Sequence, residues 1–116
     1  MLNKVFIIGN LTKDPDTSTV SNGDTMCRFT IAVNRKYTNK QTGEKDVDFF
    51  NVTCWRGLAE SCGRYLTKGK KVMVMGSLEN RQFDDREGNR KYYTDIIADE
   101  VEFFSAKDGG FSRHDD

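Results

Sequence analysis

Hydrophobic and polar residues alternate along most of this chain, with the period of two that is typical of β-strands with one buried face. Segments rich in glycine, proline, asparagine and aspartate interrupt the alternation and indicate turns. We expect five strands, at residues 4–11, 26–34, 46–55, 70–83 and 92–104, the last of them long or bulged.

One segment between the third and fourth expected strands has helical spacing instead. In residues 58–66, the side chains of Leu58, Cys62, Tyr65 and Leu66 fall at i, i+4, i+7 and i+8, on one face of a helix. Five mostly antiparallel strands with one short helix between strands 3 and 4 are the layout of an all-β OB-fold barrel. The main competitor, an SH3-like barrel, has no natural place for a full helix after its third strand.

Side-chain parity divides the third expected strand into a core face and a surface face. The apolar set, which we expect to point into the barrel, is Phe50, Val52 and Cys54. The opposite set alternates two rings with an amide and a hydroxyl: Phe49, Asn51, Thr53 and Trp55. A nucleobase can stack on each such ring while the polar neighbours contact its edge and the phosphates. We therefore interpret this face as a platform for a single-stranded nucleic acid.

The fourth expected strand repeats this arrangement. Its inward set is Val72, Val74, Gly76 and Leu78. Its outward set includes Arg81 and a third ring, Phe83. A fourth candidate, Tyr37, continues the inward parity of the second strand, so it is supported only by its loop position and the adjacent Arg35 and Lys36. A lone aromatic in a strand is usually core, but three rings of polar parity beside a separate apolar core favour stacking.

Charge is balanced over the whole chain but not locally. The 116 residues include 18 basic and 18 acidic side chains, which argues against a generally basic coating protein and still allows a basic groove. Residues 28–71 contain ten basic and four acidic side chains, and more cations lie on the last hairpin. The cations that we expect to contact phosphates are Arg35, Lys36, Arg56, Arg81, Arg86, Arg90 and Lys91.

The cysteines and the histidine favour no metal or redox site. Cys27, Cys54 and Cys62 have no CxxC spacing, and the single histidine, His114, lies in a polar terminal segment. We therefore expect free thiols in a reducing cytoplasm, with no zinc site and no cofactor.

Enzymatic functions lack the residues that they need. The acid pairs in loops, Asp14 with Asp16 and Asp84 with Asp85, fit turns better than the converging carboxylates of a metal-dependent nuclease. The chain has no GxxxxGK[ST] motif for an ATP-driven helicase, and no apolar run approaches the roughly 18 residues of a membrane span. We expect a binding protein, not an enzyme, with no membrane partner.

Several separate motifs resemble those of the bacterial single-stranded DNA-binding proteins, in the order found in that family. They are NKV at 3–5, IGNLTKDP at 8–15, FTIAVNR at 29–35, LAE at 58–60, YLTKG at 65–69 and GSL at 76–78. The resemblance implies an OB-fold, a homotetramer, and wrapping of single-stranded DNA in replication, recombination and repair. It also implies a cytoplasmic, nucleoid-associated protein. It places stacking aromatics at Tyr37, Phe49, Trp55 and Phe83, and basic contacts at Lys68 and Arg81.

Two features depart from the family pattern. Several family members carry tryptophan at the stacking positions, whereas this chain has only Trp55 and uses tyrosine or phenylalanine elsewhere. Family members also end in a long linker and an acidic tip closing in Ile-Pro-Phe, which recruits replication and repair proteins, whereas this sequence ends in RHDD. We expect a DNA-binding domain at residues 1–105 and a flexible tail at 106–116, short or truncated. Replication and repair proteins are possible partners through this tail, but the missing tip puts that recruitment in doubt.

The sequence allows alternatives for the ligand and for the role of the first strand. A barrel that binds single-stranded RNA or another oligomeric ligand would use the same rings, although a ribose-specific site should contact the 2′-hydroxyl. The first strand is apolar on both faces, since Phe6 and Ile8 oppose Val5 and Ile7. Such a strand can pair with a second copy or be covered by a tail of the same chain.

Overall fold

The computed structural model describes residues 1–104 and 111–113. Within them the elements are β1 (Val5–Leu11), β2 (Asp16–Thr19), β3 (Thr25–Thr38), β4 (Lys45–Trp55), α1 (Arg56–Tyr65), β5 (Lys71–Asp84), β6 (Arg90–Phe104) and β7 (Phe111–Arg113). No helix in this described part of the chain is long and apolar enough to cross a bilayer.

Five of these strands close into a barrel. They pair in the order β1-β5-β6-β4-β3, and a further pairing of β1 with β3 completes the ring. The β4–β6 pair is parallel and the other pairs in the ring are antiparallel. Counted among barrel strands alone, α1 follows the third, so the expected OB-fold layout is confirmed.

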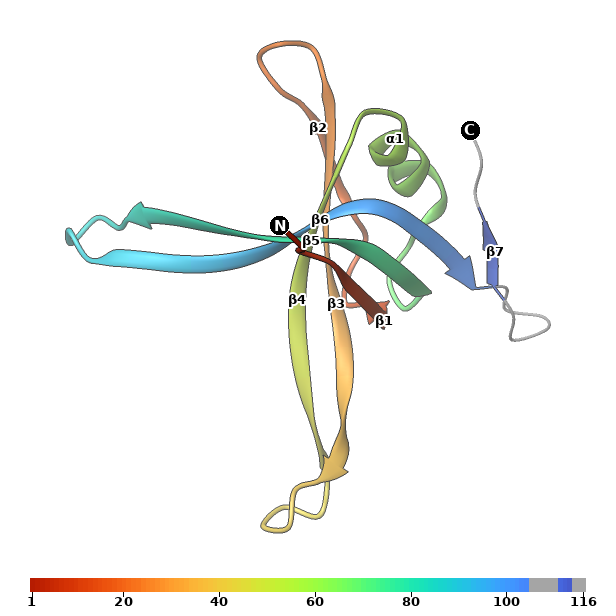
Figure 1. The fold of residues 1–116 in the computed structure, drawn as a ribbon, viewed down its shortest axis with the longest axis vertical. Coiled ribbons are helices and arrows are strands. Elements are labelled where there is room, and N and C mark those ends of the chain that lie inside the picture. The colour runs from red at the N-terminus through yellow and green to blue at the C-terminus, as the bar shows by residue number, and fades with distance from the viewer. Residues whose placement is uncertain (105–110, 114–116) are drawn as a thin grey trace.

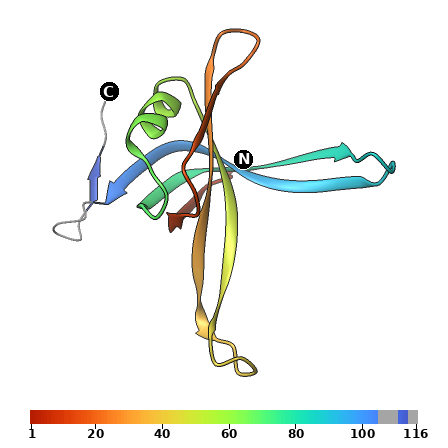
Figure 2. The same ribbon diagram turned by 180° about the vertical axis from the view of Figure 1, so that it is seen from behind.

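Long hairpins project from the barrel as arms. In Figure 1 the β3–β4 arm points downward, the β5–β6 arm points to the left, and the β2–β3 turn lies at the top. Figure 2 shows the same arms from behind, with α1 beside the barrel rather than on either long arm. The arms extend the surface of a small barrel well beyond its core.

The core lies between the barrel strands and α1. Its fully buried side chains are mostly β-branched or small, such as Ile31, Val52, Val74 and Ile96. Gly76 allows β5 and β6 to approach closely, because a Cβ there would lie 2.2 Å from the carbonyl oxygen of Ile97. Alternating burial along β3, β4 and β5 follows the predicted parity through the barrel body.

The three cysteines are buried and free, as expected. The Sγ atoms of Cys54 and Cys62 are 3.9 Å apart, close enough for a weak thiol hydrogen bond. That contact and burial raise the pKa of Cys54, and burial raises the pKa of Cys27. Both thiols therefore stay protonated and serve as small apolar core groups.

Two short strands were not predicted. The segment that forms β2 has the sequence DTST and is exposed throughout, so it lacks an apolar face that could indicate a strand. It pairs with the edge of β3. The segment Phe111–Arg113 was expected to belong to a flexible tail, but it pairs with β6 as β7. Residues 105–110 and 114–116, including His114, lie outside the described residues.

Some side-chain orientations predicted from strand parity or helical spacing were wrong. Leu78 was expected in the core and is 42% exposed, because the β5–β6 arm leaves the barrel there (Figure 1). Thr53 was expected on the surface and is buried in a pocket that Arg28 also lines. Tyr65 was placed on the apolar face of the helix and is 46% exposed, since α1 buries only a narrow stripe against the barrel.

Candidate nucleic-acid interface

The four predicted stacking rings all lie on the surface. Tyr37 is 81% exposed, Phe49 64%, Phe83 45% and Trp55 37%. Phe49 and Trp55 project from the outer face of β4, as their parity predicted, whereas Phe50 on the opposite parity is packed against the core. Large rings that face solvent on a strand are available for stacking without repacking the core.

Tyr37 reaches the surface for a different reason from the one predicted. It belongs to β3, not to a loop, and the β3–β4 register shifts between Asn34 and Thr38. Because this irregularity lies on the arm beyond the barrel body, the inward parity of β3 no longer leads to a core. Tyr37 is therefore exposed even though its parity predicted the opposite.

Trp55 lies at the corner where β4 ends and α1 begins. Arg56 follows it with a φ of 57°, the left-handed region that non-glycine residues seldom occupy. The Arg56 guanidinium lies 3.6 Å from the Asp24 carboxylate, which links this corner to the β2–β3 turn. The sharp bend keeps the indole at the barrel surface instead of carrying it under α1.

Phe83 belongs to a stack that the sequence analysis missed. Its ring lies parallel to that of Tyr93, with the centroids 5.3 Å apart and an interplanar angle of 3°. The Arg81 guanidinium lies 4.9 Å from the Tyr93 centroid, and Arg81 Nε donates a 2.5 Å hydrogen bond to Asp95. Counting back from the 85–89 turn places Arg81 opposite Tyr93, so the hairpin register was the signal that could have identified Tyr93.

The predicted cations differ in how far nearby acids compensate them. Arg35 makes two hydrogen bonds to Asp48, which raise the pKa of Arg35 and lower that of Asp48. The other ion pairs of the predicted cations join Arg56 to Asp24, Arg81 to Asp95, Arg90 to Asp84, and Lys91 to Asp85. Across residues 1–104 and 111–113, no ion pair is found for Lys36, Lys68 or Arg86. Among the described residues, these three predicted cations have no acidic partner for their charged groups.

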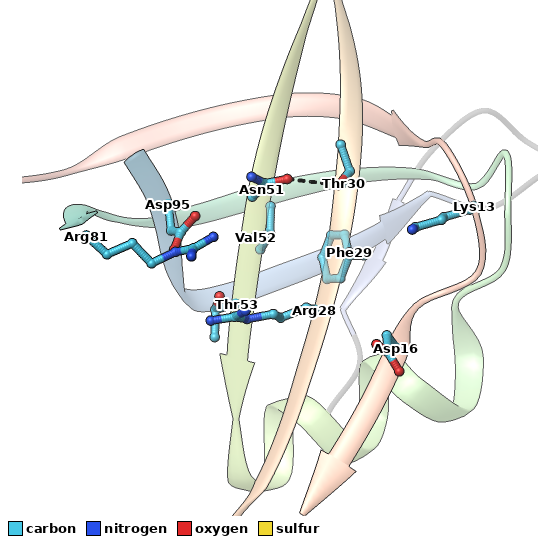
Figure 3. A pocket seen from close by; sticks show the side chains of 10 residues that line it. All are labelled: Lys13, Asp16, Arg28, Phe29, Thr30, Asn51, Val52, Thr53, Arg81 and Asp95. Carbon is cyan, nitrogen blue, oxygen red and sulfur yellow. Dashed lines mark hydrogen bonds and ion pairs between the residues drawn. The ribbon is translucent and has the colours of Figure 1, made fainter. Parts of the chain in front are cut away.

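A polar pocket lies on the outer face of β4, between Phe49 and Trp55. Its volume is about 200 Å³. Figure 3 shows its lining residues: Lys13, Asp16, Arg28, Phe29, Thr30, Asn51, Val52, Thr53, Arg81 and Asp95. Among the described residues, neither Lys13 nor Arg28 has an ion-pair partner. The sequence did not predict either cation as a contact, because only the tertiary structure brings them beside the β4 platform.

A second hollow, of about 590 Å³, runs beside β1. Phe6 and Ile8 line it and are 69% and 51% exposed. Phe50 and Tyr37 contribute from β4 and β3. Asn34, Arg35, Lys36 and Asp48 also line the hollow, so its apolar part is the area along β1.

Comparison with known proteins shows which family this chain resembles. The model of the single-strand binding protein family matches residues 2–104. This chain belongs to that family. A single-stranded DNA-binding protein of Caldanaerobacter subterraneus subsp. tengcongensis is 47% identical over 109 residues, which cover 94% of this chain and 72% of the relative. One of Bacillus cereus is 42% identical over 110 residues, which cover 95% of this chain and 64% of the relative.

A solved structure supports the fold independently. It is described as a complex of Plasmodium falciparum SSB with ssDNA, and it superposes with a TM-score of 0.80 at 27% identity, covering 90% of this chain and 97% of the other. The family resemblance and the OB-fold expected from the sequence are therefore confirmed. Within the described residues there is no cluster of three or more His, Cys, Asp or Glu side chains suited to a metal ion.

Proposed function

We propose that this protein binds single-stranded DNA with little sequence preference and protects it where it is exposed in replication, recombination and repair. The observation that carries the proposal is the exposure of Tyr37, Phe49, Trp55 and Phe83 beside cations, in a chain of the single-strand binding protein family. The ssDNA complex of the structural neighbour supports DNA as the ligand. Action in the cytoplasm, on DNA of the nucleoid, would follow from this role.

The proposed mechanism is passive binding. Bases stack on the four rings, each stack contributing about 1–3 kcal/mol. Lysine and arginine side chains displace counterions from the phosphates, which makes binding weaker at higher salt. The proposed phosphate contacts are Arg35, Lys36, Arg56, Lys68, Arg81, Arg86, Arg90 and Lys91. Every base has a π-face, so stacking tolerates any sequence, whereas a duplex already stacks its bases internally and binds poorly.

A fluorescence titration tests the proposal directly. The protein carries a single tryptophan, Trp55, so its emission reports on one proposed stacking site. Added oligo-dT should quench the emission in a saturable way, and an equal length of duplex DNA should not. Saturable binding of the duplex at the same affinity would contradict the proposed mode.

RNA is the alternative ligand, because its bases can stack on the same rings. Competition between equal lengths of poly-dT and poly-U at one salt concentration separates the two. The proposal expects poly-dT to displace a labelled DNA oligomer at the lower concentration. Preferential displacement by poly-U would favour an RNA-binding function instead.

We also propose that the chain assembles with copies of itself, as a homotetramer, through the apolar surface along β1. Phe6 and Ile8 expose hydrophobic area that water-facing strands seldom leave open. Light scattering should give four times the chain mass for the native sequence. Phe6→Lys should lower that mass, because it places a charge in the contact. Tyr92→Lys, at a 72% exposed ring on the β5–β6 arm, is the matched control and should leave the mass unchanged.

A further inference from the structure

The rings on β4 are too far apart for one nucleotide step. Phe49 and Trp55 are separated by six residues along a strand, or about 20 Å at the usual rise. Successive phosphates of one strand in duplex DNA are about 3.4 Å apart along the axis. Even a strand stretched to twice that rise therefore has nucleotides between the two rings, above Asn51 and Thr53, where β4 offers no ring.

The polar pocket described above occupies this interval, and it contains an unsatisfied acceptor. Asp95 lines the pocket from β6, its side chain is only 6% exposed, and its Oδ2 accepts the hydrogen bond from Arg81. Its Oδ1 is buried and has no partner in the part of the chain that the structure describes. A buried carboxylate oxygen without a donor is unfavourable, so this atom is suited to an incoming N–H group.

A donor lies next to that acceptor. Asn51 is the register partner of Asp95 across the parallel β4–β6 pair, and its Oδ1 accepts a 2.9 Å hydrogen bond from the Thr30 hydroxyl. No acceptor for the Asn51 amide nitrogen is found among the described residues, which leaves this nitrogen as the donor. Figure 3 shows the Asp95 carboxyl group against the Arg81 guanidinium, with Asn51 beyond them on β4.

We propose that this pocket holds the edge of one amino-bearing nucleobase, with Asp95 accepting from its exocyclic amino group and Asn51 donating to the adjacent ring nitrogen. This deepens the proposed function and rests on it. Arg81 stays on Oδ2 of Asp95, which leaves Oδ1 as the acceptor for the base. Lys13 and Arg28 line the same pocket and neutralise the phosphates of the nucleotide that enters it.

The pocket's acids favour a base over a phosphate. At the Asp95 end of the pocket, a phosphate presents only acceptors and would face the unpartnered carboxylate oxygen. The amino group of cytosine is a natural partner for a carboxylate. Uracil and thymine carry their single ring N–H between two carbonyl oxygens, which a carboxylate repels. The pocket should therefore add a preference for amino-bearing bases to binding that is otherwise insensitive to sequence.

The test compares oligo-dC with oligo-dU, which differ at the exocyclic group and the adjacent ring nitrogen. Oligomers of about eight nucleotides suit a single OB-fold. Binding is measured by anisotropy at one salt concentration for the native protein and for Asp95→Asn, which keeps the shape but turns the acceptor into a donor. The variant should weaken dC binding about tenfold or more relative to dU, the range of one hydrogen bond to a charged group.

Two further variants make the result decisive. Asp99→Asn is the matched control, because Asp99 is also on β6 but is half-exposed and paired with Lys4 outside the pocket. It should leave the dC-to-dU affinity ratio unchanged. Asn51→Leu removes the donor and should lower the ratio in the same direction as Asp95→Asn, so the test survives if Asp95→Asn fails to fold.

The outcomes separate this inference from the proposed function. If both oligomers bind and neither pocket variant changes their affinity ratio, or the variants weaken both equally, the pocket does not recognise a base and only this inference fails. If the native protein binds neither oligomer, the proposed function fails as well.

Discussion

At the scale of single residues, the exposure of a ring is set by which way its strand points it and by whether a core lies behind it. Trp55 illustrates both conditions. Its parity directs it away from the core that Cys54 enters, and the left-handed Arg56 turns the chain before α1 can cover the indole. Backbone geometry thus contributes to keeping part of the ring at the surface.

The first prediction concerns this residue. Trp55→Ala should weaken binding of a labelled oligo-dT by about 1–3 kcal/mol, because it removes one stacking surface. Anisotropy of the labelled DNA measures the effect, since the substitution also removes the only tryptophan. The fold should stay intact, which circular dichroism checks, but the unfolding temperature should fall because nearly two-thirds of the side chain, 37% exposed, is buried. Unchanged affinity would mean that Trp55 serves packing alone.

At the scale of elements, the β5–β6 arm presents a prearranged stack. Asp95 holds Arg81, Arg81 lies against Tyr93, and Tyr93 lies flat against Phe83. One face of Phe83 is therefore occupied and the ring is oriented before DNA arrives. An ordered ring loses less conformational freedom on binding, so the arm should bind more tightly than a mobile ring would.

The second prediction tests Tyr93 as a positioning residue. Tyr93→Leu should weaken oligo-dT binding by about 0.5–1.5 kcal/mol, the range of one aromatic pair, because Phe83 loses its support. Tyr93→Phe keeps the ring and should bind like the native protein. Tyr92→Leu is the control on the opposite face of the same strand and should have a smaller effect than Tyr93→Leu. Equal losses for the two leucine variants would contradict the positioning role.

The same arm marks the limit of what strand patterns predict. Alternation placed Phe83 on the surface, but it could not place Tyr93 beside it without the register of the hairpin. Leu78 is apolar and has the parity of a core residue, but it is exposed. The reason is that β5 leaves the barrel there, so its inward face no longer has a core behind it. β2 was missed because a polar edge strand whose residues are all exposed has no hydrophobic signal.

At the scale of the whole molecule, the distribution of free charge matters more than the zero net charge. Five of the predicted cations are paired with acids in the free protein, whereas Lys36 is not. A paired cation must give up or share its carboxylate before it releases counterions from DNA. The salt dependence of binding should therefore reflect the unpaired cations most strongly.

The third prediction uses two neighbouring residues that differ in this respect. Each neutralised phosphate contributes about −0.7 to the slope of log affinity against log salt for a single strand. Lys36→Ala should make the slope shallower by about that amount. Replacing Arg35 and Asp48 together by alanine removes an ion pair of no net charge and should leave the slope nearly unchanged. A larger change for the double variant would show that pairing does not limit a cation's contribution.

The sequence by itself determined the barrel, the family and the surface position of three rings. Hydrophobic alternation is a local property, and it fixes which face of a strand such as β4 is buried wherever a core lies behind it. Phe49 and Trp55 share the polar parity, so they could not join the core without exposing Val52 and Cys54.

The tertiary structure alone decided how the surface groups are combined. Asp95 lies 44 residues from Asn51 along the chain and becomes its neighbour only through the parallel β4–β6 pair. Strand register and barrel closure determine which cations are paired with acids, which ring supports Phe83, and where the polar pocket opens. These are long-range contacts between side chains, and no local pattern along the chain contains them.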